Sequence, residues 1–144
     1  MNRATVFERH LPPDHSLLGP LRHDVAAELA DRAAPSLVSD AVLVISELTT
    51  NAITAARTSS EDVVVRVRAP EDDELIIEVE DNGPGFAFDD RMTRRPRGED
   101  ERGRGLRIVE AVADDVQVDR VQHRTRVRAL LRRHEPLKLA GNFK

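Results

Sequence analysis

The chain has 144 residues, a formal net charge of −4, 33% charged residues and no cysteine. That length suits one domain that buries its own core, and the absence of cysteine excludes disulfide bonds and thiolate metal sites. The mixed charge gives no overall positive field for nucleic acid, so we expect no direct nucleic-acid binding. The sequence shows no apolar signal core and no apolar run near the roughly 20 residues of a bilayer span, so we expect a cytoplasmic protein without membrane contact.

The first part of the sequence predicts one strand followed by two helices. The strand is expected over residues 4–11, because two consecutive prolines follow it. Leucine and valine then recur at helical spacing over residues 17–29, which predicts a first helix. A second helix is expected to begin at Pro35. Its core-facing stripe would consist of Ala41, Ile45, Leu48, Ala52 and Ala55.

The middle of the chain predicts a hairpin and a long polar loop. Apolar residues alternate with polar ones over residues 63–67 and again over 75–79, and the polar residues 70–73 join the two strands. The charge-dense stretch at 89–102 is too long and too polar for a tight connection. We interpret this stretch as a mobile lid.

The last part of the chain predicts a third helix and a second pair of strands. The helix is expected to open at Gly103 and Gly105, and the strands are expected over residues 116–121 and 125–132. Residues 134–144 are expected to form a loose tail. The apolar residues of the third helix are Leu106, Ile108, Val109 and Val112.

Two polar residues of the second helix, Glu47 and Asn51, are four positions apart and therefore project from one face beside the core stripe. A carboxamide oxygen suits a hard cation, and a carboxylate suits the orientation or deprotonation of a hydroxyl. The same spacing also fits an ordinary exposed helix face. Spacing alone leaves both interpretations open.

Asp81 and Thr125 are polar residues in otherwise apolar strand rows. Each has the parity of its apolar neighbours, so both side chains should face the same interior. A buried carboxylate and a hydroxyl at the floor of a cleft can read the amino edge of adenine, directly or through water. Gly83 and Gly85, just after Asp81, let the backbone turn sharply and approach a ligand. A simple turn and a β-favouring threonine bonded to backbone are the alternatives.

The second glycine cluster lies where the polar loop meets the third helix. Backbone N–H groups and a positive helix end at Gly103 and Gly105 can receive phosphates. Arg102 and Arg104 can add charge-assisted bonds to the outer phosphates, or they can simply be solvated. The cluster is not a Walker A loop, because no Gly-Lys-Ser/Thr follows it.

These three motifs in this order, Glu-Leu-Thr-Thr-Asn, Asp-Asn-Gly-Pro-Gly and Gly-Arg-Gly-Leu, resemble the N, G1 and G2 boxes of GHKL ATPases. The compact arrangement over about residues 4–133 is similar to the anti-sigma factor serine/threonine kinases. The resemblance implies the Bergerat ATP-binding fold, an α/β (α+β) two-layer sandwich in which helices cover one face of a mixed, mainly antiparallel sheet. We therefore expect a single domain at residues 1–133 and a C-terminal tail at 134–144.

The resemblance also implies ATP and Mg²⁺ as cofactors and a role for each site residue. Asn51 would hold Mg²⁺ together with ATP, and Glu47 would be the catalytic base. Asp81 would bind the adenine amino group near Thr125. Arg102 or Arg104 would take the place of the lid arginine that reads the terminal phosphate. The pocket wall and the phosphate cradle would be formed by Gly83, Gly85, Gly103, Gly105 and Leu106.

The function that the resemblance implies is partner switching. The nucleotide-loaded protein would sequester a sigma factor and would transfer the γ-phosphoryl group to a serine or threonine of an anti-sigma factor antagonist. We expect a homodimer, because such relatives commonly pair. A histidine kinase fragment is a weaker alternative, and a plain α/β domain would require three coincidences in the right order.

One departure from the family pattern favours a second function. Many relatives carry a basic or histidine residue three or four positions after the box asparagine, whereas this chain has Thr54 and Ala55 there. The alternative is a nucleotide-dependent protein-binding regulator without kinase activity.

Overall fold

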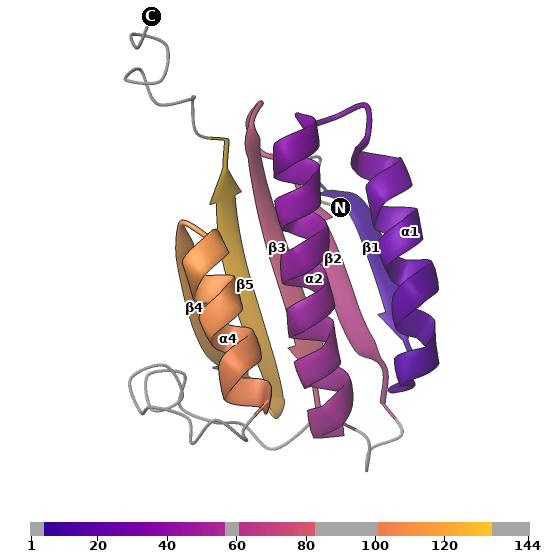
Figure 1. Cartoon of the computed structure of the whole chain (residues 1–144). Helices are drawn as coiled ribbons and strands as arrows, with labels where there is room; N and C mark the ends of the chain where they lie inside the picture. The colour runs from indigo at the N-terminus through magenta and orange to yellow at the C-terminus, as the bar shows by residue number, and fades with distance from the viewer. Residues whose placement is uncertain (1–4, 57–60, 83–100, 134–144) are drawn as a thin grey trace, which may run out of the picture.

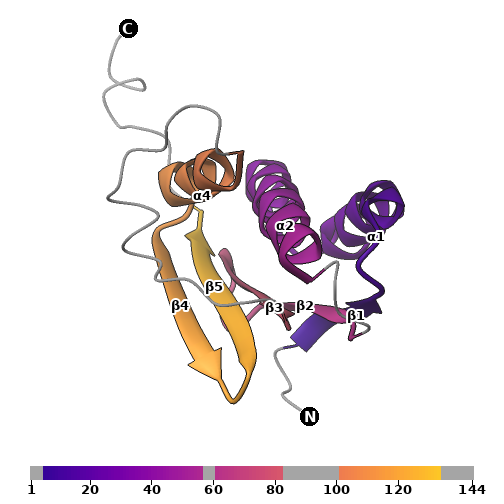
Figure 2. The same ribbon diagram turned by 90° about the horizontal axis from the view of Figure 1, so that it is seen from below.

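The computed structural model describes residues 5–56, 61–82 and 101–133, without the side chains of residues 101–104. Within these ranges the chain forms a five-stranded sheet in the order β1–β2–β3–β5–β4, and every pairing is antiparallel. The α-helices lie in one layer over one face of this sheet (Figure 1) (Figure 2). The expected two-layer α+β sandwich is confirmed, and its sheet, expected to be mixed and mainly antiparallel, is wholly antiparallel in the described strands.

The helices and strands follow the predicted order closely. In chain order they are β1 (Thr5–Leu11), the short 3-10 helix η1 (His15–Leu17), α1 (Leu18–Leu29), α2 (Pro35–Ala56), β2 (Val63–Arg68), β3 (Glu74–Asp81), α4 (Glu101–Val112), β4 (Asp115–Val121) and β5 (Arg124–Arg132). One boundary matters for the site. Because α4 begins at Glu101, Gly103 and Gly105 lie inside its first turns instead of opening it.

α2 is the central helix of the layer and packs against α1, α4 and β3. The predicted apolar stripe is confirmed except at its last member, because the row continues from Ala52 to Ala56, and Ala55 is half-buried. By length and composition alone this helix could cross a membrane. Because α2 lies between α1 and α4 and packs against the sheet, its apolar residues are those of a core helix.

The apolar residues of α4 are not all buried. Leu106 and Val109 lie in the core, whereas Ile108 is 39% exposed. The reason is the helical period, because positions 106 and 109 share one face and position 108 is rotated away from them.

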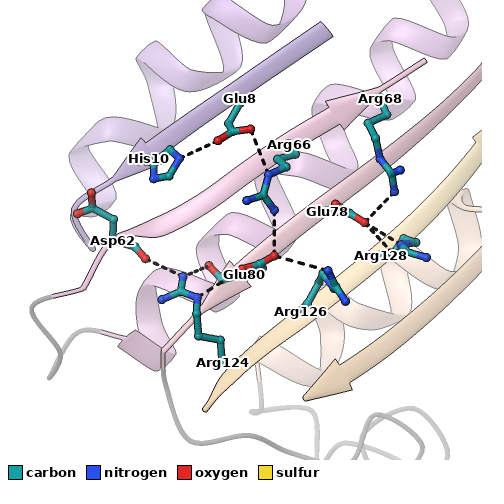
Figure 3. Close-up of polar contacts among 10 residues, drawn as sticks. All are labelled: Glu8, His10, Asp62, Arg66, Arg68, Glu78, Glu80, Arg124, Arg126 and Arg128. Carbon is teal, nitrogen blue, oxygen red and sulfur yellow. Dashed lines mark hydrogen bonds and ion pairs between the residues drawn. The ribbon is translucent and has the colours of Figure 1, made fainter. Parts of the chain in front are cut away.

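The sheet has two chemically different faces. On the helix-facing side, β3 and β5 bury two apolar rows that end at Asp81 and Thr125. The opposite face carries a network of ion pairs (Figure 3). At its centre Glu78, only 5% exposed, accepts hydrogen bonds from Arg68 and Arg128, each at 2.9 Å. The polar site residues therefore belong to the helix side, where a ligand would lie between the layers.

Candidate functional site

At the contact between α2 and α4, the backbone of one helix lies against the polar face of the other. A Cβ atom added at Gly105 would lie 3.0 Å from Glu47 Oε1, and 3.5 and 3.6 Å from Asn51 Nδ2 and Oδ1. The nearest of these separations is shorter than ordinary van der Waals contact, so a side chain at position 105 would require the Glu47 carboxylate to shift. Two motifs that are distant in the sequence thus meet in one place.

Asn51 carries a hydrogen-bond donor that its surroundings in the described residues do not satisfy. Its Nδ2 atom is buried and has no hydrogen-bond partner in the part of the chain that the structure describes. A buried amide donor without a partner costs about 1–3 kcal/mol of stability. An oxygen of a bound ligand would remove that cost, and phosphate oxygens are suitable acceptors.

A second polar group lies on the sheet below the helices. Asp81 on β3 is directly opposite Thr125 on β5, so both side chains are on the helix-facing side. Both are buried, with exposed fractions of 7% and 1%. The expectation that these two polar side chains share one interior is confirmed. The Thr125 hydroxyl accepts a hydrogen bond of 2.7 Å from Nη1 of Arg120, a residue that sequence analysis did not select.

The elements that carry these groups end or begin at one end of the molecule. Figure 1 shows the C-terminal end of α2, the C-terminal end of β3 and the first turn of α4 together there. The helix that carries Glu47 and Asn51 and the Asp81–Thr125 pair of the sheet therefore lie on the same side of the sheet, toward the same end. A nucleotide could span them, with its base on the sheet and its phosphates at the two helices.

The structure tests the other predicted positions only in part. Gly83 and Gly85 lie outside the described residues, and the side chains of Arg102 and Arg104 are not described. Gly103 lies in the first turn of α4. The side chain of Leu106, which was predicted to line the phosphate cradle, is 2% exposed and lies in the hydrophobic core. Only the backbone of Leu106 could therefore face a phosphate.

Thr54, one of the two positions that depart from the family pattern, makes hydrogen-bonding contacts within this chain. The Thr54 hydroxyl donates to the carbonyl of Thr50 at 2.9 Å, and Nε2 of His15 lies 3.3 Å from the same hydroxyl. His15 belongs to η1, so an imidazole reaches this part of α2 from another element. Thr54 is thus occupied by contacts with residues of this chain.

Comparison with known proteins identifies the family and agrees with the fold. The sequence profile of the histidine kinase-like ATPase domain matches residues 11–131. No curated protein sequence matches the chain significantly. The chain, a two-layer α+β domain, therefore belongs to the histidine kinase-like ATPase domain family. The resemblance to GHKL ATPases is confirmed.

Three solved structures show the same fold at low sequence identity. The RsbU and RsbW domains of Rv1364c from Mycobacterium tuberculosis superpose with a TM-score of 0.66 at 20% identity, over 90% of this chain and 33% of that chain. The SiaB–SiaC complex from Pseudomonas aeruginosa gives 0.65 at 16% identity, over 90% of both chains. The Acinetobacter baumannii histidine kinase AdeS gives 0.54 at 14% identity, over 90% of this chain and 69% of that chain. This chain thus spans a third of the first of these proteins.

Proposed function

We propose that this protein binds ATP with Mg²⁺ and acts as an anti-sigma factor-like serine/threonine kinase that regulates transcription by partner switching. The observation that carries the proposal is the unpartnered donor of Asn51 beside the glycine backbone of α4. Membership of the ATPase domain family supports the nucleotide. The fold similarity to RsbW and to a protein found in a two-protein complex, SiaB–SiaC, supports a protein partner.

The residues present fit Mg²⁺ and ATP in chemical type. The amide oxygen of Asn51 is a hard ligand suited to Mg²⁺, and its amide hydrogen suits a phosphate oxygen. Bound Mg²⁺ would supply charge neutralisation for phosphoryl transfer. Glu47 would accept the proton of a substrate hydroxyl, and the proximity of its Oε1 atom to Gly105 of α4 supports this role.

The other end of the nucleotide would be held by the sheet. The Asp81 carboxylate would accept a hydrogen bond from the adenine amino group, and Thr125 lies directly opposite Asp81. Burial strengthens these contacts, because a low-dielectric site makes each hydrogen bond count for more. Gly103 and Gly105 keep the first turns of α4 open to phosphates, with Arg102 or Arg104 at the terminal phosphate.

The proposal is tested first by calorimetric titration with ATP and Mg²⁺. The unmodified protein should bind, and Asp81→Asn, which keeps the shape but loses the negative acceptor, should weaken binding at least about tenfold. Asp115→Asn is the matched control, because Asp115 is an exposed carboxylate at the start of the edge strand β4. Equal affinity of all three proteins for ATP would remove the proposed base-binding role of Asp81.

Kinase activity requires a separate measurement. Transfer of labelled γ-phosphate to a serine-containing antagonist protein should occur with the unmodified chain, and Glu47→Gln should reduce the rate without a similar loss of ATP affinity. A chain that binds ATP, binds a protein partner and transfers no phosphate would instead be a nucleotide-dependent regulator. The absence of a basic or histidine residue at Thr54 and Ala55, where many relatives carry one, favours this second candidate.

The assembly and its place in the cell are part of the same proposal. We expect a homodimer in the cytoplasm that contacts a sigma factor, an antagonist protein or both, with no direct contact to nucleic acid or membrane. Light scattering of the purified protein, with and without ATP, measures the number of copies. A monomer under both conditions would contradict the dimer.

A further inference from the structure

The row of polar residues on the helix-facing side of the sheet has a third member. Arg120 on β4 lies directly opposite Thr125 on β5, which in turn lies opposite Asp81 on β3. Arg120 continues the row of Val116 and Val118, both packed against the core. Its side chain therefore starts on the side of the sheet that the helices cover, next to the floor of the proposed nucleotide site.

The contact between Arg120 and Thr125 has a fixed direction. Nη1 of Arg120 donates to Oγ1 of Thr125 at 2.7 Å. A guanidinium carries only donors, whereas a hydroxyl has one hydrogen to donate and two lone pairs to accept. The hydrogen of Thr125 cannot be donated to Arg120, so it is available for another acceptor. In the part of the chain that the structure describes, the Thr125 side chain makes no other hydrogen bond.

We propose that Arg120 is a positioning residue that determines base specificity, because it fixes the buried Thr125 hydroxyl as a hydrogen-bond donor beside the acceptor Asp81. This inference rests on the proposed nucleotide site. Without Arg120, the hydroxyl of Thr125 can rotate and serve either as donor or as acceptor. With Arg120 in place, the row presents one acceptor and one donor to the edge of a bound base.

That pattern matches adenine and opposes guanine or hypoxanthine. Adenine offers its 6-amino group as a donor and N1 as an acceptor, so Asp81 pairs with the former and Thr125 with the latter, directly or through one water. Guanine and hypoxanthine carry an acceptor oxygen at position 6 and an N1–H donor, which is the reverse pattern. A buried polar group without a matching partner costs more free energy than a matched hydrogen bond contributes. The loss of binding free energy for guanine or hypoxanthine should therefore be larger than the gain that these two hydrogen bonds give for adenine.

The test compares ATP with 1-deaza-ATP, which lacks the N1 acceptor but keeps the 6-amino group. The unmodified protein should bind ATP about tenfold more tightly than 1-deaza-ATP by calorimetry. Arg120→Met should bind ATP several-fold more weakly, while its affinity for 1-deaza-ATP stays nearly unchanged, so the ratio falls to about two or less. Arg120→Lys keeps a donor and should retain most of the ratio.

Two controls separate this role from a general effect on folding. Arg132→Met removes an arginine of β5 whose side chain instead pairs with Glu74, and it should leave both affinities unchanged. Thermal unfolding of every variant should show a folded protein. Equal weakening of both nucleotides by Arg120→Met would indicate a merely structural role and would overturn the proposal.

The remaining outcomes are equally decisive. Equal binding of ATP and 1-deaza-ATP by the unmodified protein would show that Thr125 gives no hydrogen to N1, and the proposal would fall while the nucleotide site stood. Binding of neither nucleotide would overturn the nucleotide site itself. A variant ratio unchanged from that of the unmodified protein would show that Arg120 does not direct the hydroxyl.

Discussion

Substitution of Gly105 by alanine should separate the stability of the fold from its ability to bind a nucleotide. In a helix interior alanine is more favourable than glycine by about 1 kcal/mol. Against this gain stands the new Cβ atom, 3.0 Å from Glu47 Oε1. The carboxylate is the end of a flexible side chain, so a shift of a few tenths of an ångström relieves the contact at small cost. We expect Gly105→Ala to be between unchanged and about 1 kcal/mol more stable.

The effect on binding should have the opposite sign. The same Cβ atom lies 3.5 and 3.6 Å from the carboxamide of Asn51, so the substitution fills the space beside the proposed phosphate and Mg²⁺ ligand. We expect ATP affinity to fall at least about tenfold, equivalent to roughly 1.4 kcal/mol. Urea denaturation measures the first quantity, and calorimetry with ATP and Mg²⁺ measures the second.

Gly19 in α1 supplies the matched control. Chain neighbours aside, a Cβ atom added there meets nothing within 4 Å, so Gly19→Ala adds a methyl group to a helix without contact with Glu47 or Asn51. Because Pro20 follows and disfavours helical backbone at a preceding alanine, we expect no gain in stability, and the variant should bind ATP normally. If Gly105→Ala also bound ATP with normal affinity, the interhelical contact would not be part of the nucleotide site, and the reasoning would be refuted.

Three further substitutions test individual groups. Asn51→Leu should raise the free energy of unfolding by about 1 kcal/mol, because it removes a buried donor without a partner in the described residues, and should abolish ATP binding; a variant less stable than the unmodified protein would contradict this. Glu78→Ala should lower the free energy of unfolding by about 2–3 kcal/mol in urea denaturation, because it leaves two partly exposed arginines without their carboxylate partner. Glu74→Ala removes one pair whose arginine is exposed and should cost about 0.5 kcal/mol or less. Equal costs would contradict this. A backbone hydrogen bond from Ser16 lowers the pKa of Asp14, so the stability from its charged form is present above the ordinary carboxyl pKa and is lost as the pH falls below about 4. Asp14→Asn should show a weaker loss of stability in acid-dependent thermal unfolding; an unchanged acid dependence would contradict this.

Periodicity predicted most of the fold, because burial imposes it directly. The strand rows ending at Asp81 and Thr125 follow a period of two, and their shared orientation could be deduced from parity alone. Four of the five residues predicted for the buried stripe of α2 are buried, but the buried surface of this helix is wider and also includes Val44 and Ile53. The apolar residues of α4 were named without a decision on which of them is buried, because apolar character indicates a preference for burial but does not tell whether Ile108 or Val109 meets the core.

The contacts between distant elements were beyond prediction from periodicity. Gly105 was selected for backbone N–H groups at a helix start, yet its described contact is the close approach to Glu47 and Asn51, which depends on how two helices cross. Arg120 was missed, because its partner depends on the register of β4 against β5. The parity that Arg120 shares with Val118 was the available signal, but the short turn between the strands carries no typical hairpin sequence to fix the register.

The ion pairs on the sheet face opposite the helices do not by themselves fix the register of β3 against β5. If β5 slipped by two residues in one direction, Glu78 and Glu80 would still lie opposite arginines, and each face would keep its parity. The buried row would disfavour this register, because Thr125 would then lie opposite Val79, and Asp81 would lose its hydroxyl neighbour. The residues that we propose to bind the base would thus also help to specify the register of β3 and β5 during folding.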